Sequence, residues 1–447
     1  MADTIPLAAD QSMEVHARAV ADARLDRIAA RVFRRFVPFL MVCYVVAYLD
    51  RVNIGFAKMA MSADIGLSEF AYGLGAGVFF IGYFLFEVPS NILLERFGAR
   101  RWICRIMLTW AVLSAAFAFV RSTEAFYALR FVLGIAEAGF FPGVLLFLSQ
   151  WFPAARRGQI IAMFMAAIPL AGLVGSPLSG SIMAVMDGVA GLEGWRWMFL
   201  LEAAPAFLLG IATLFVLDSR IADAAWLGDD DKALLTKTLA GEEPQADKQQ
   251  GKCHKGVLAA MLDPGVLTFA FIYFCCIMGQ YGVTFWLPTL VSAAGATGTL
   301  DMGLFTAIPY AVAIVVMIAT GRHSDHTGER RWHVFWPMMA GGILLVATTF
   351  LSTSFALAMV LMSLATAAVL TATPMFWTLP TQALSGRAAV VGIAAINSVG
   401  NLAGFLSPIV VGWISQTTGS TANGMAALAA CLFAGALVVA TKPALTR

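Results

Sequence analysis

Twelve apolar stretches divide the amino-acid sequence, and most reach the ~20 residues that an α-helix needs to cross the ~30 Å hydrocarbon core of a membrane. Only 13% of the residues are charged, against about 25% in a typical soluble domain. The sequence therefore predicts an all-α membrane protein with twelve transmembrane helices. The expected spans are 36–57, 70–93, 102–121, 124–150, 159–185, 195–217, 265–290, 300–320, 332–352, 354–378, 387–412 and 421–441.

A long polar segment separates six of these spans from the other six. It contains "GDDDK" and "GEEPQADKQQGKCHK", a composition typical of a solvated or partly helical linker. The segment before the first span is polar and contains arginines, so no cleavable leader is predicted. The expected organisation is a cytosolic N-terminal segment at 1–35, six-helix bundles at 36–217 and 263–441, a cytosolic linker at 218–262 and a cytosolic tail at 442–447.

Lysine and arginine residues gather on one side of the predicted helices. Of the 29 in the chain, Arg51 and Arg130 lie within spans, and Lys58, Arg121 and Arg196 lie on one side. The remaining 24 lie on the other side, together with both termini and the linker. Cytoplasmic loops carry the excess of positive charge, so both termini are expected to be cytosolic. The outer loops contain no N-x-S/T sequence, which favours a bacterial inner membrane as the location.

Two connections in the chain resemble each other. "GARR" at 98–101 and "GERR" at 328–331 each follow the second span of their half, at an offset of 230 residues. This pattern predicts two six-helix repeats in the same orientation, as in large transporters. At the same offset, the adjacent Asp50 and Arg51 of the first half become an amide and a phenol in the second half.

Four charged side chains lie within the predicted spans at overlapping depths: Asp50 and Arg51 on the first, Arg130 and Glu137 on the fourth. A charge at mid-membrane costs at least ~2.5–3.5 kcal/mol, so such residues are functional candidates with partners on other helices. Two guanidinium groups can bind an organic anion, and a carboxyl that loses its guanidinium partner to that anion can take up a proton. The alternative is a fixed buried network that only holds the helices together.

The other carboxyls and the glycines of these spans suit structural roles. Glu87 and Glu202 lie near opposite ends of their spans and are interpreted as structural. Gly134 and Gly139 are expected to let another helix approach the fourth span closely.

The second half offers polar and aromatic side chains that could complete a binding pocket. Amides and hydroxyls can bind a carboxylate or a polyhydroxy ligand, and aromatic rings can stack on a ring. The tenth span contains Pro374 and Pro380, which can break its helix. The candidates are Gln280 and Tyr281 on the seventh span, Trp377 on the tenth, and Asn397 and Asn401 on the eleventh. For each aromatic residue, lipid contact or helix packing is the alternative.

Several motifs together resemble a known family. The two repeats with their "RR" loops resemble the major facilitator superfamily, although Asn91 stands where glycine is usual and Glu95 replaces aspartate. Within it, the chain is similar to the anion:cation symporter family. The motifs that carry this similarity are "YLDRVNIGFA" at 48–57, "EVPSNILLERFGARRW" at 87–102, "GWRWMFLLEAAPA" at 194–206, "YGVTFWLP" at 281–288 and "INSVGNLAGF" at 396–405.

The resemblance implies roles for individual residues. It implies proton coupling and substrate binding for the four charges, with Asp50 and Glu137 as proton sites. It places Tyr48, Tyr83, Gln280, Trp377 and Asn397 in the pocket. It also implies that the loop residues form inter-helix salt bridges that hold an outward-open state; the expected gating residues are Glu95, Arg100, Arg101, Asp325, Arg330 and Arg331.

The predicted function is proton-coupled import of an organic carboxylate by alternating access. An exchanger or a uniporter on the same fold is the alternative, and a hydroxy-dicarboxylate such as tartrate, a sugar acid and an aromatic acid remain open as substrates. No H-E-x-x-H, G-x-S-x-G or C-x-x-C motif is present, so neither an enzyme nor a metal or cofactor site is expected. The dispersed positive charges predict no nucleic-acid binding. The expected partners are the substrate, protons and the lipid bilayer, with the chain as a monomer.

Overall fold

A computed structural model describes residues 5–153, 160, 163–250, 263–383 and 386–442. Within these residues the chain is helical and contains twelve helices that are long and apolar enough to cross a membrane. The predicted number of spans is therefore confirmed. The predicted tail at 442–447 and the end of the predicted linker at 218–262 lie largely outside the described residues, and the predicted domain bounds stay a prediction.

The helices form two sets, which the linker helix α9 separates in the sequence. The first set comprises α1 (Ile5–Ile65), α2 (Glu69–Phe97), α3 (Ala99–Ala116), α4 (Thr123–Glu137), α5 (Phe140–Ser149), α7 (Ala167–Val185) and α8 (Gly194–Val216). The linker helix α9 covers Asp229–Gln250. The second set comprises α11 (Pro264–Ala294), α12 (Thr299–Thr327), α13 (Arg331–Leu351), α14 (Phe355–Ala383), α15 (Gly386–Thr418) and α16 (Thr421–Thr441).

Several helices begin where the sequence supplies a capping side chain. Ser68 accepts a hydrogen bond from the backbone N–H of Ala71 at the start of α2, at 3.1 Å. Asp263 does the same for Gly265 at the start of α11, at 2.8 Å, and a proline occupies the first helical position there. These side chains satisfy N–H groups that have no partner within the helix, and so they define where the spans begin.

The two halves share a repeat that extends to the helix ends. Helix α2 runs over 69–97 and α12 over 299–327, so that both ends differ by the offset of 230 residues predicted from the loop motifs. Gly98 and Gly328 end these helices with positive φ angles of 81° and 68°, a conformation that favours glycine. The internal repeat is thus confirmed at the level of backbone conformation.

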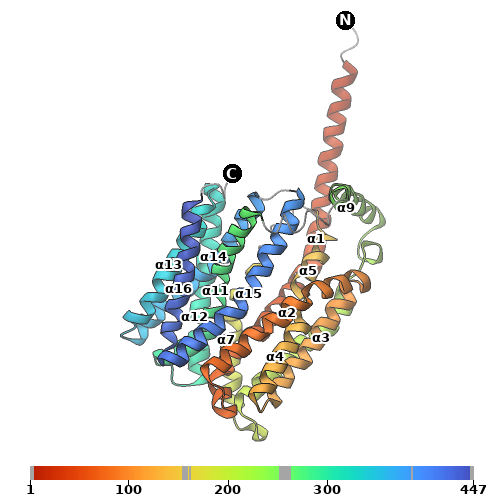
Figure 1. The fold of residues 1–447 in the computed structure, drawn as a ribbon. Helices are drawn as coiled ribbons and strands as arrows, with labels where there is room; N and C mark the ends of the chain where they lie inside the picture. Colours follow the sequence, from red (N-terminus) through yellow and green to blue (C-terminus); the bar gives the residue numbers. More distant parts are fainter. Residues whose placement is uncertain (1–4, 154–159, 161–162, 251–262, 384–385, 443–447) are drawn as a thin grey trace.

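Figure 1 shows the beginning of α1, the end of α16 and helix α9 on one side of the molecule, here called the termini face. On the opposite, distal face, the halves meet through α2 with α15 and through α7 with α12. A Cβ atom on Gly73 would lie 3.3 Å from Gly412 Cα, and one on Gly303 would lie 2.9 Å from Gly180 Cα. Gly73 and Gly303 are also 230 residues apart, so equivalent glycines close both sides of the distal face.

Three local features differ from the expectation. Helix α1 continues from Ile5 to Ile65 without a break at the predicted start of the first span. The fourth span, expected as one helix, is divided into α4 and α5 at Ala138 and Gly139. Conversely, α14 runs through Pro374 and Pro380 as one helix, so the expected break is wrong. Its neighbours α12 and α13 support α14 along its length, which lets the prolines be tolerated.

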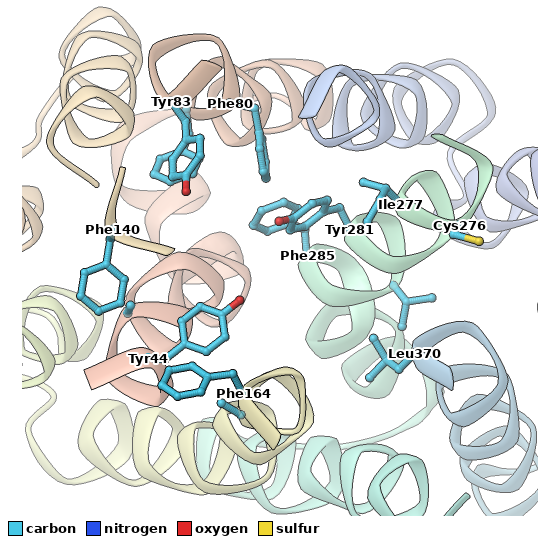
Figure 2. Packing of buried hydrophobic residues seen from close by; sticks show 14 of the residues in the cluster. Tyr44, Phe80, Tyr83, Phe140, Phe164, Cys276, Ile277, Tyr281, Phe285 and Leu370 are labelled. Atoms are coloured by element: carbon cyan, nitrogen blue, oxygen red, sulfur yellow. The ribbon is translucent and has the colours of Figure 1, made fainter. Parts of the chain in front are cut away.

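Aromatic rings fill the space between the halves near the middle of the bundle. Figure 2 shows Phe80 and Tyr83 of α2 facing Tyr281 and Phe285 of α11. The Phe80 and Tyr281 rings meet edge to face, with centroids 4.5 Å apart. Tyr83 of this cluster also lies beside Arg51, one of the charged residues described next.

Candidate functional site

A buried ion pair joins Arg51 on α1 to Glu137 on α4. Arg51 Nη2 donates to Glu137 Oε2 at 2.8 Å, and the Glu137 side chain is 1% exposed while that of Arg51 is 13% exposed. Arg51 Nε and Glu137 Oε1 have no hydrogen-bond partner within the described residues. The pair therefore retains an unused donor and an unused acceptor, which are costly in a buried site.

The break in the fourth span positions Glu137. Helix α4 ends at Glu137, Ala138 leaves the helical conformation, and Gly139 adopts a positive φ of 85° before α5 begins. A Cβ atom on Gly139 would collide with the Ser90 hydroxyl of α2, and one on Gly134 would collide with the Phe79 carbonyl. The predicted close approach at both glycines is therefore confirmed. The discontinuous helix resembles those that surround substrate sites in other transporters.

Arg130, one of the four predicted interior charges, binds backbone rather than a carboxylate. Its guanidinium donates to the carbonyls of Gly75 and Ala76 on α2, at 3.2 and 3.1 Å, and lies 4.8 Å from the Phe79 ring centroid. It forms no ion pair with Glu137 within the described residues. In this conformation Arg130 braces α4 against α2, and its predicted contact with the substrate stays a prediction.

Asp50 points away from the arginines. It accepts hydrogen bonds from Trp110 Nε1 at 2.5 Å and from Ser114 Oγ at 3.2 Å, both on α3. Both residues thus have the expected partners on other helices, Arg51 on α4 and Asp50 on α3. Successive helix residues differ by about 100° in direction, so Asp50 faces α3 while Arg51 faces α4. Asp50 is 1% exposed and has no cationic partner within the described residues.

Three side chains link the halves across the centre. Gln280 Nε2 on α11 donates to the Tyr48 hydroxyl on α1 at 3.3 Å, and Gln280 Oε1 accepts from Thr373 Oγ1 on α14 at 2.8 Å. The sequence indicated Tyr48 and Gln280 but not Thr373, which lies within the apolar stretch of the tenth span. All three are buried, so the amide is held in one orientation.

The predicted aromatic residues lie at three places. Tyr83 and Tyr48 surround Arg51, whose guanidinium carbon lies 5.3 and 5.9 Å from their ring centroids. Tyr281 stacks on Phe285, at the boundary of the halves (Figure 2). Trp377 packs edge to face on Tyr273, within the second half, with centroids 4.8 Å apart. The first two rings therefore lie beside Arg51, and Trp377 belongs to a neighbouring cluster; the predicted contacts of these rings with a substrate stay a prediction.

Asn397 and Asn401 bind a carboxylate of this chain. They donate to the two oxygens of Glu87 on α2, at 3.4 and 3.1 Å, which confirms that they share one face of α15. Glu87 follows Tyr83 by one helical turn, so both belong to the face of α2 that also contacts Arg51 through Tyr83. Glu87 was expected to be structural, and this contact shows that it connects the halves.

Another buried carboxylate, Glu202 on α8, has neutral partners. Asn53 on α1 donates to it at 3.1 Å and Ser179 on α7 donates at 2.6 Å. These contacts hold three helices of the first half together. They agree with a structural role, and the Glu202 side chain is buried.

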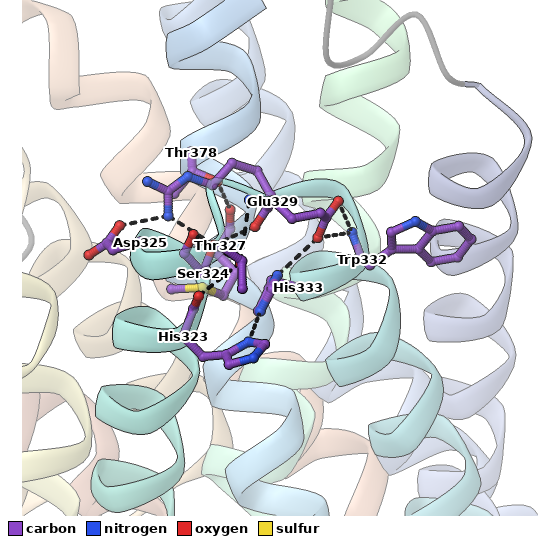
Figure 3. A network of polar contacts seen from close by, with 10 residues as sticks. His323, Ser324, Asp325, Thr327, Glu329, Trp332, His333 and Thr378 are labelled. Carbon is purple, nitrogen blue, oxygen red and sulfur yellow. Dashed lines mark hydrogen bonds and ion pairs between the residues drawn. The ribbon is translucent and has the colours of Figure 1, made fainter.

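The two "RR" loops differ in their contacts. Asp325 pairs with Arg330 at 2.7 Å within its own loop, while Arg331 donates to the last carbonyls of α16, those of Val439 and Ala440. Figure 3 shows Asp325 and Ser324 within this network, together with His323 and His333. The first loop contributes Glu95, Arg100 and Arg101. None of the three forms an ion pair with another residue in the part of the chain that the structure describes. The gating roles stay a prediction.

A separate polar contact closes the distal face. Lys58 on α1 pairs with Glu69 on α2 at 2.8 Å, lies 4.1 Å from the Trp286 ring centroid and is 2% exposed. Glu69 also accepts a hydrogen bond from Ser415 on α15, at 3.3 Å. No pattern in the sequence had indicated this contact between the halves. No group of three metal-binding side chains occurs among the described residues.

Comparisons with known proteins agree with this arrangement. Residues 40–408 match the family model described as Major Facilitator Superfamily. A candidate tartrate transporter from Agrobacterium vitis is 47% identical over 412 residues, 92% of this chain and 94% of that protein. NicT, a candidate metabolite transport protein from Pseudomonas putida, is 44% identical over 410 residues, 92% of this chain and 93% of that protein.

Solved structures share the fold. A bacterial homologue of the human lysosomal transporter Spinster, in an inward-facing and occupied conformation, aligns with a TM-score of 0.73 at 15% identity, over 90% of this chain and 95% of that chain. The two relatives above are named as transport proteins, in agreement with the prediction that the chain is not an enzyme.

Proposed function

Because the chain belongs to the major facilitator superfamily, we propose that it imports an organic carboxylate together with protons by alternating access. The observation that carries this proposal is the buried Arg51–Glu137 ion pair with its unused donor and acceptor. A transporter that couples two ligands needs a site at which binding of one changes the affinity for the other, and this pair supplies such a site.

The coupling follows from the chemistry of the pair. A guanidinium is permanently charged and can hold two carboxylate oxygens at once. When a substrate carboxylate binds Arg51, Glu137 loses its partner in a site of low polarity, where an isolated carboxylate is unstable. Glu137 then takes up a proton, so that anion and proton bind together. Asp50 is proposed as a second proton site, because it is buried without a cationic partner.

The second half would hold the remainder of the substrate. Gln280 is fixed by Tyr48 and Thr373 and can exchange one of these hydrogen bonds for one to a substrate hydroxyl. Asn397 and Asn401 now bind the carboxylate of Glu87, and a substrate carboxylate could take its place. Both sets of contacts cross between the halves, so binding is sensitive to their relative position.

The relatives favour one substrate class among those left open. The candidate tartrate transporter of Agrobacterium vitis shares 47% of its residues with this chain over nearly the full length of both. We therefore place hydroxy-dicarboxylates first, and sugar acids and aromatic acids after them. The proposed location is a bacterial inner membrane with the termini face in the cytosol, supported by the distribution of positive charge.

Uptake into liposomes tests the proposal. Purified protein would be offered labelled tartrate, a sugar acid and an aromatic acid, each with and without an inward proton gradient. We expect accumulation of one acid that depends on the gradient. Exchange without gradient-driven accumulation would identify an exchanger or a uniporter, and the absence of any uptake would contradict the organic-anion assignment.

A further inference from the structure

Three arginines form a cluster near the termini-face end of the first span. Arg31, Arg34 and Arg35 are spaced i, i+3, i+4 on α1, so they lie on one side of the helix, and all three are exposed. With Phe215 and Val216 of α8 and with Trp226, they line a cavity of about 570 Å³. None of these six residues is acidic, so the cavity, here called the arginine cavity, is open to an anion.

Acidic residues lie near two of the three arginines, Arg31 and Arg35. Asp231 pairs with Arg31 at 3.2 Å, but it also pairs with Arg24 at 2.7 Å and so serves two guanidinium groups. Arg35 is 3.7 Å from an Asp218 oxygen, a long contact. Arg34 donates to the backbone carbonyl of Ala30 and has no acidic partner in the part of the chain that the structure describes.

The other wall of the arginine cavity has the aromatic composition that is typical of the level at which hydrocarbon meets lipid headgroups. Phe215 lies one residue before the end of α8 and is 76% exposed. The Trp226 ring stacks on Trp151 and donates its N–H to Asp218 at 2.7 Å, while Arg35 lies 5.2 Å from its ring centroid. Rings with one apolar and one polar side gather at this level of a membrane protein.

We propose that the arginine cavity binds the phosphate of an anionic phospholipid in the leaflet at the termini face. Guanidinium groups hold phosphate oxygens in pairs, and basic pockets at this level between transmembrane helices suit anionic headgroups. An acyl chain can pack against the apolar wall of the cavity, which consists of Phe215, Val216 and Trp226. A free phosphate ion would leave this wall exposed. The occupant is therefore a lipid, held between α1 and α8.

Native mass spectrometry of the purified full-length protein tests this proposal. The probes are cardiolipin, phosphatidylglycerol, phosphatidylethanolamine and inorganic phosphate. The variants are Arg34→Gln, which breaks no ion pair, and the triple variant Arg31→Gln/Arg34→Gln/Arg35→Gln. The matched control removes three other exposed positive charges, on α2, α9 and α12; it is Arg96→Gln/Lys237→Gln/Arg322→Gln.

The expected result is retention of the two anionic lipids and weaker retention of phosphatidylethanolamine and phosphate. Arg34→Gln should lower the affinity for anionic lipid about fivefold and the triple variant on the order of 100-fold, with the control unchanged. An equal loss of affinity for anionic lipid in the triple variant and in the control would overturn the proposal, because non-specific electrostatic attraction would explain both losses. Equal retention of phosphatidylethanolamine or phosphate would also overturn it, as would unchanged lipid binding by Arg34→Gln.

Discussion

Arg51 Nη2 lies 2.8 Å from Glu137 Oε2, and this ion pair joins the first and fourth spans at the point where the fourth span is broken. Helix α4 ends at Glu137, so the carboxylate can change partners without disturbing a continuous helix. The Arg51 side chain retains 13% exposure, whereas Glu137 is almost fully covered. An incoming anion would therefore reach the arginine first, and the glutamate would respond to it.

The pair predicts a non-additive effect on stability. Arg51→Gln should leave Glu137 buried without its partner and lower the free energy of unfolding by about 3–5 kcal/mol. Arg51→Gln/Glu137→Gln should recover most of this loss but remain unable to transport. Thermal unfolding in detergent measures the first effect and liposome uptake the second. A double variant as unstable as Arg51→Gln would show that the pair contributes through its shape and not through its charge.

Asp50 is predicted to serve coupling while its neighbours only orient it. Asp50→Asn keeps an acceptor oxygen for Trp110, so the protein should fold. In the native protein, protonation should change the substrate affinity about 5- to 150-fold, and this change should become smaller in Asp50→Asn. Ser114→Ala removes only the longer hydrogen bond and is the control. Substrate binding measured across a range of pH checks this expectation. An unchanged pH dependence in Asp50→Asn would remove Asp50 from the coupling mechanism.

The chain of Tyr48, Gln280 and Thr373 is predicted to set substrate affinity. Thr373→Val removes the hydroxyl that orients Gln280 and keeps the side-chain shape. Each lost buried hydrogen bond is worth roughly 1 kcal/mol, so KM should rise about fivefold, and Gln280→Ala should raise it further. Initial uptake rates at varied substrate concentration give KM and the maximal rate separately. A fall in the maximal rate at constant KM would indicate a role in the conformational change instead.

The distal face is predicted to depend on its equivalent glycines. In Gly73→Ala or Gly303→Ala the added Cβ would meet backbone atoms of the other half, and such overpacking costs about 1–3 kcal/mol. A cysteine placed at Ser415, in a background without the six native cysteines, should then react faster with an impermeant maleimide added from the distal side. Gly298→Ala is the control, because a Cβ there has no neighbour within 4 Å. Equal labelling of all variants would contradict this account of closure.

Much of the fold follows from patterns that repeat along the sequence. Apolar length predicted twelve spans, and the loop motifs predicted an offset that α2 and α12 reproduce at both ends. These features depend on local chemistry, namely hydrophobicity and a glycine at each helix end. The break after Glu137 was not predicted, because glycines also occur in many continuous membrane helices. Here Gly139 adopts a positive φ and lies against Ser90, where a Cβ atom would collide.

The partners of the charged residues were harder to predict than the residues themselves. Asp50 and Glu137 are conspicuous in apolar stretches, but which helix each faces depends on helix rotation, and this is set by packing. Asp50 therefore faces Trp110, a residue that by itself resembles any interfacial tryptophan. Thr373 gave no signal either, because threonine is common in membrane helices and can satisfy its hydroxyl within its own helix.

We propose that Glu137 carries the proton that accompanies the substrate. To test this role, the native protein is compared with Glu137→Gln in liposomes, measuring accumulation driven by an inward proton gradient and exchange of labelled for unlabelled substrate. We expect Glu137→Gln to lose gradient-driven accumulation and to retain exchange, because glutamine mimics the protonated carboxyl. If Glu137→Gln still accumulates substrate in response to the proton gradient, Glu137 is not the proton carrier.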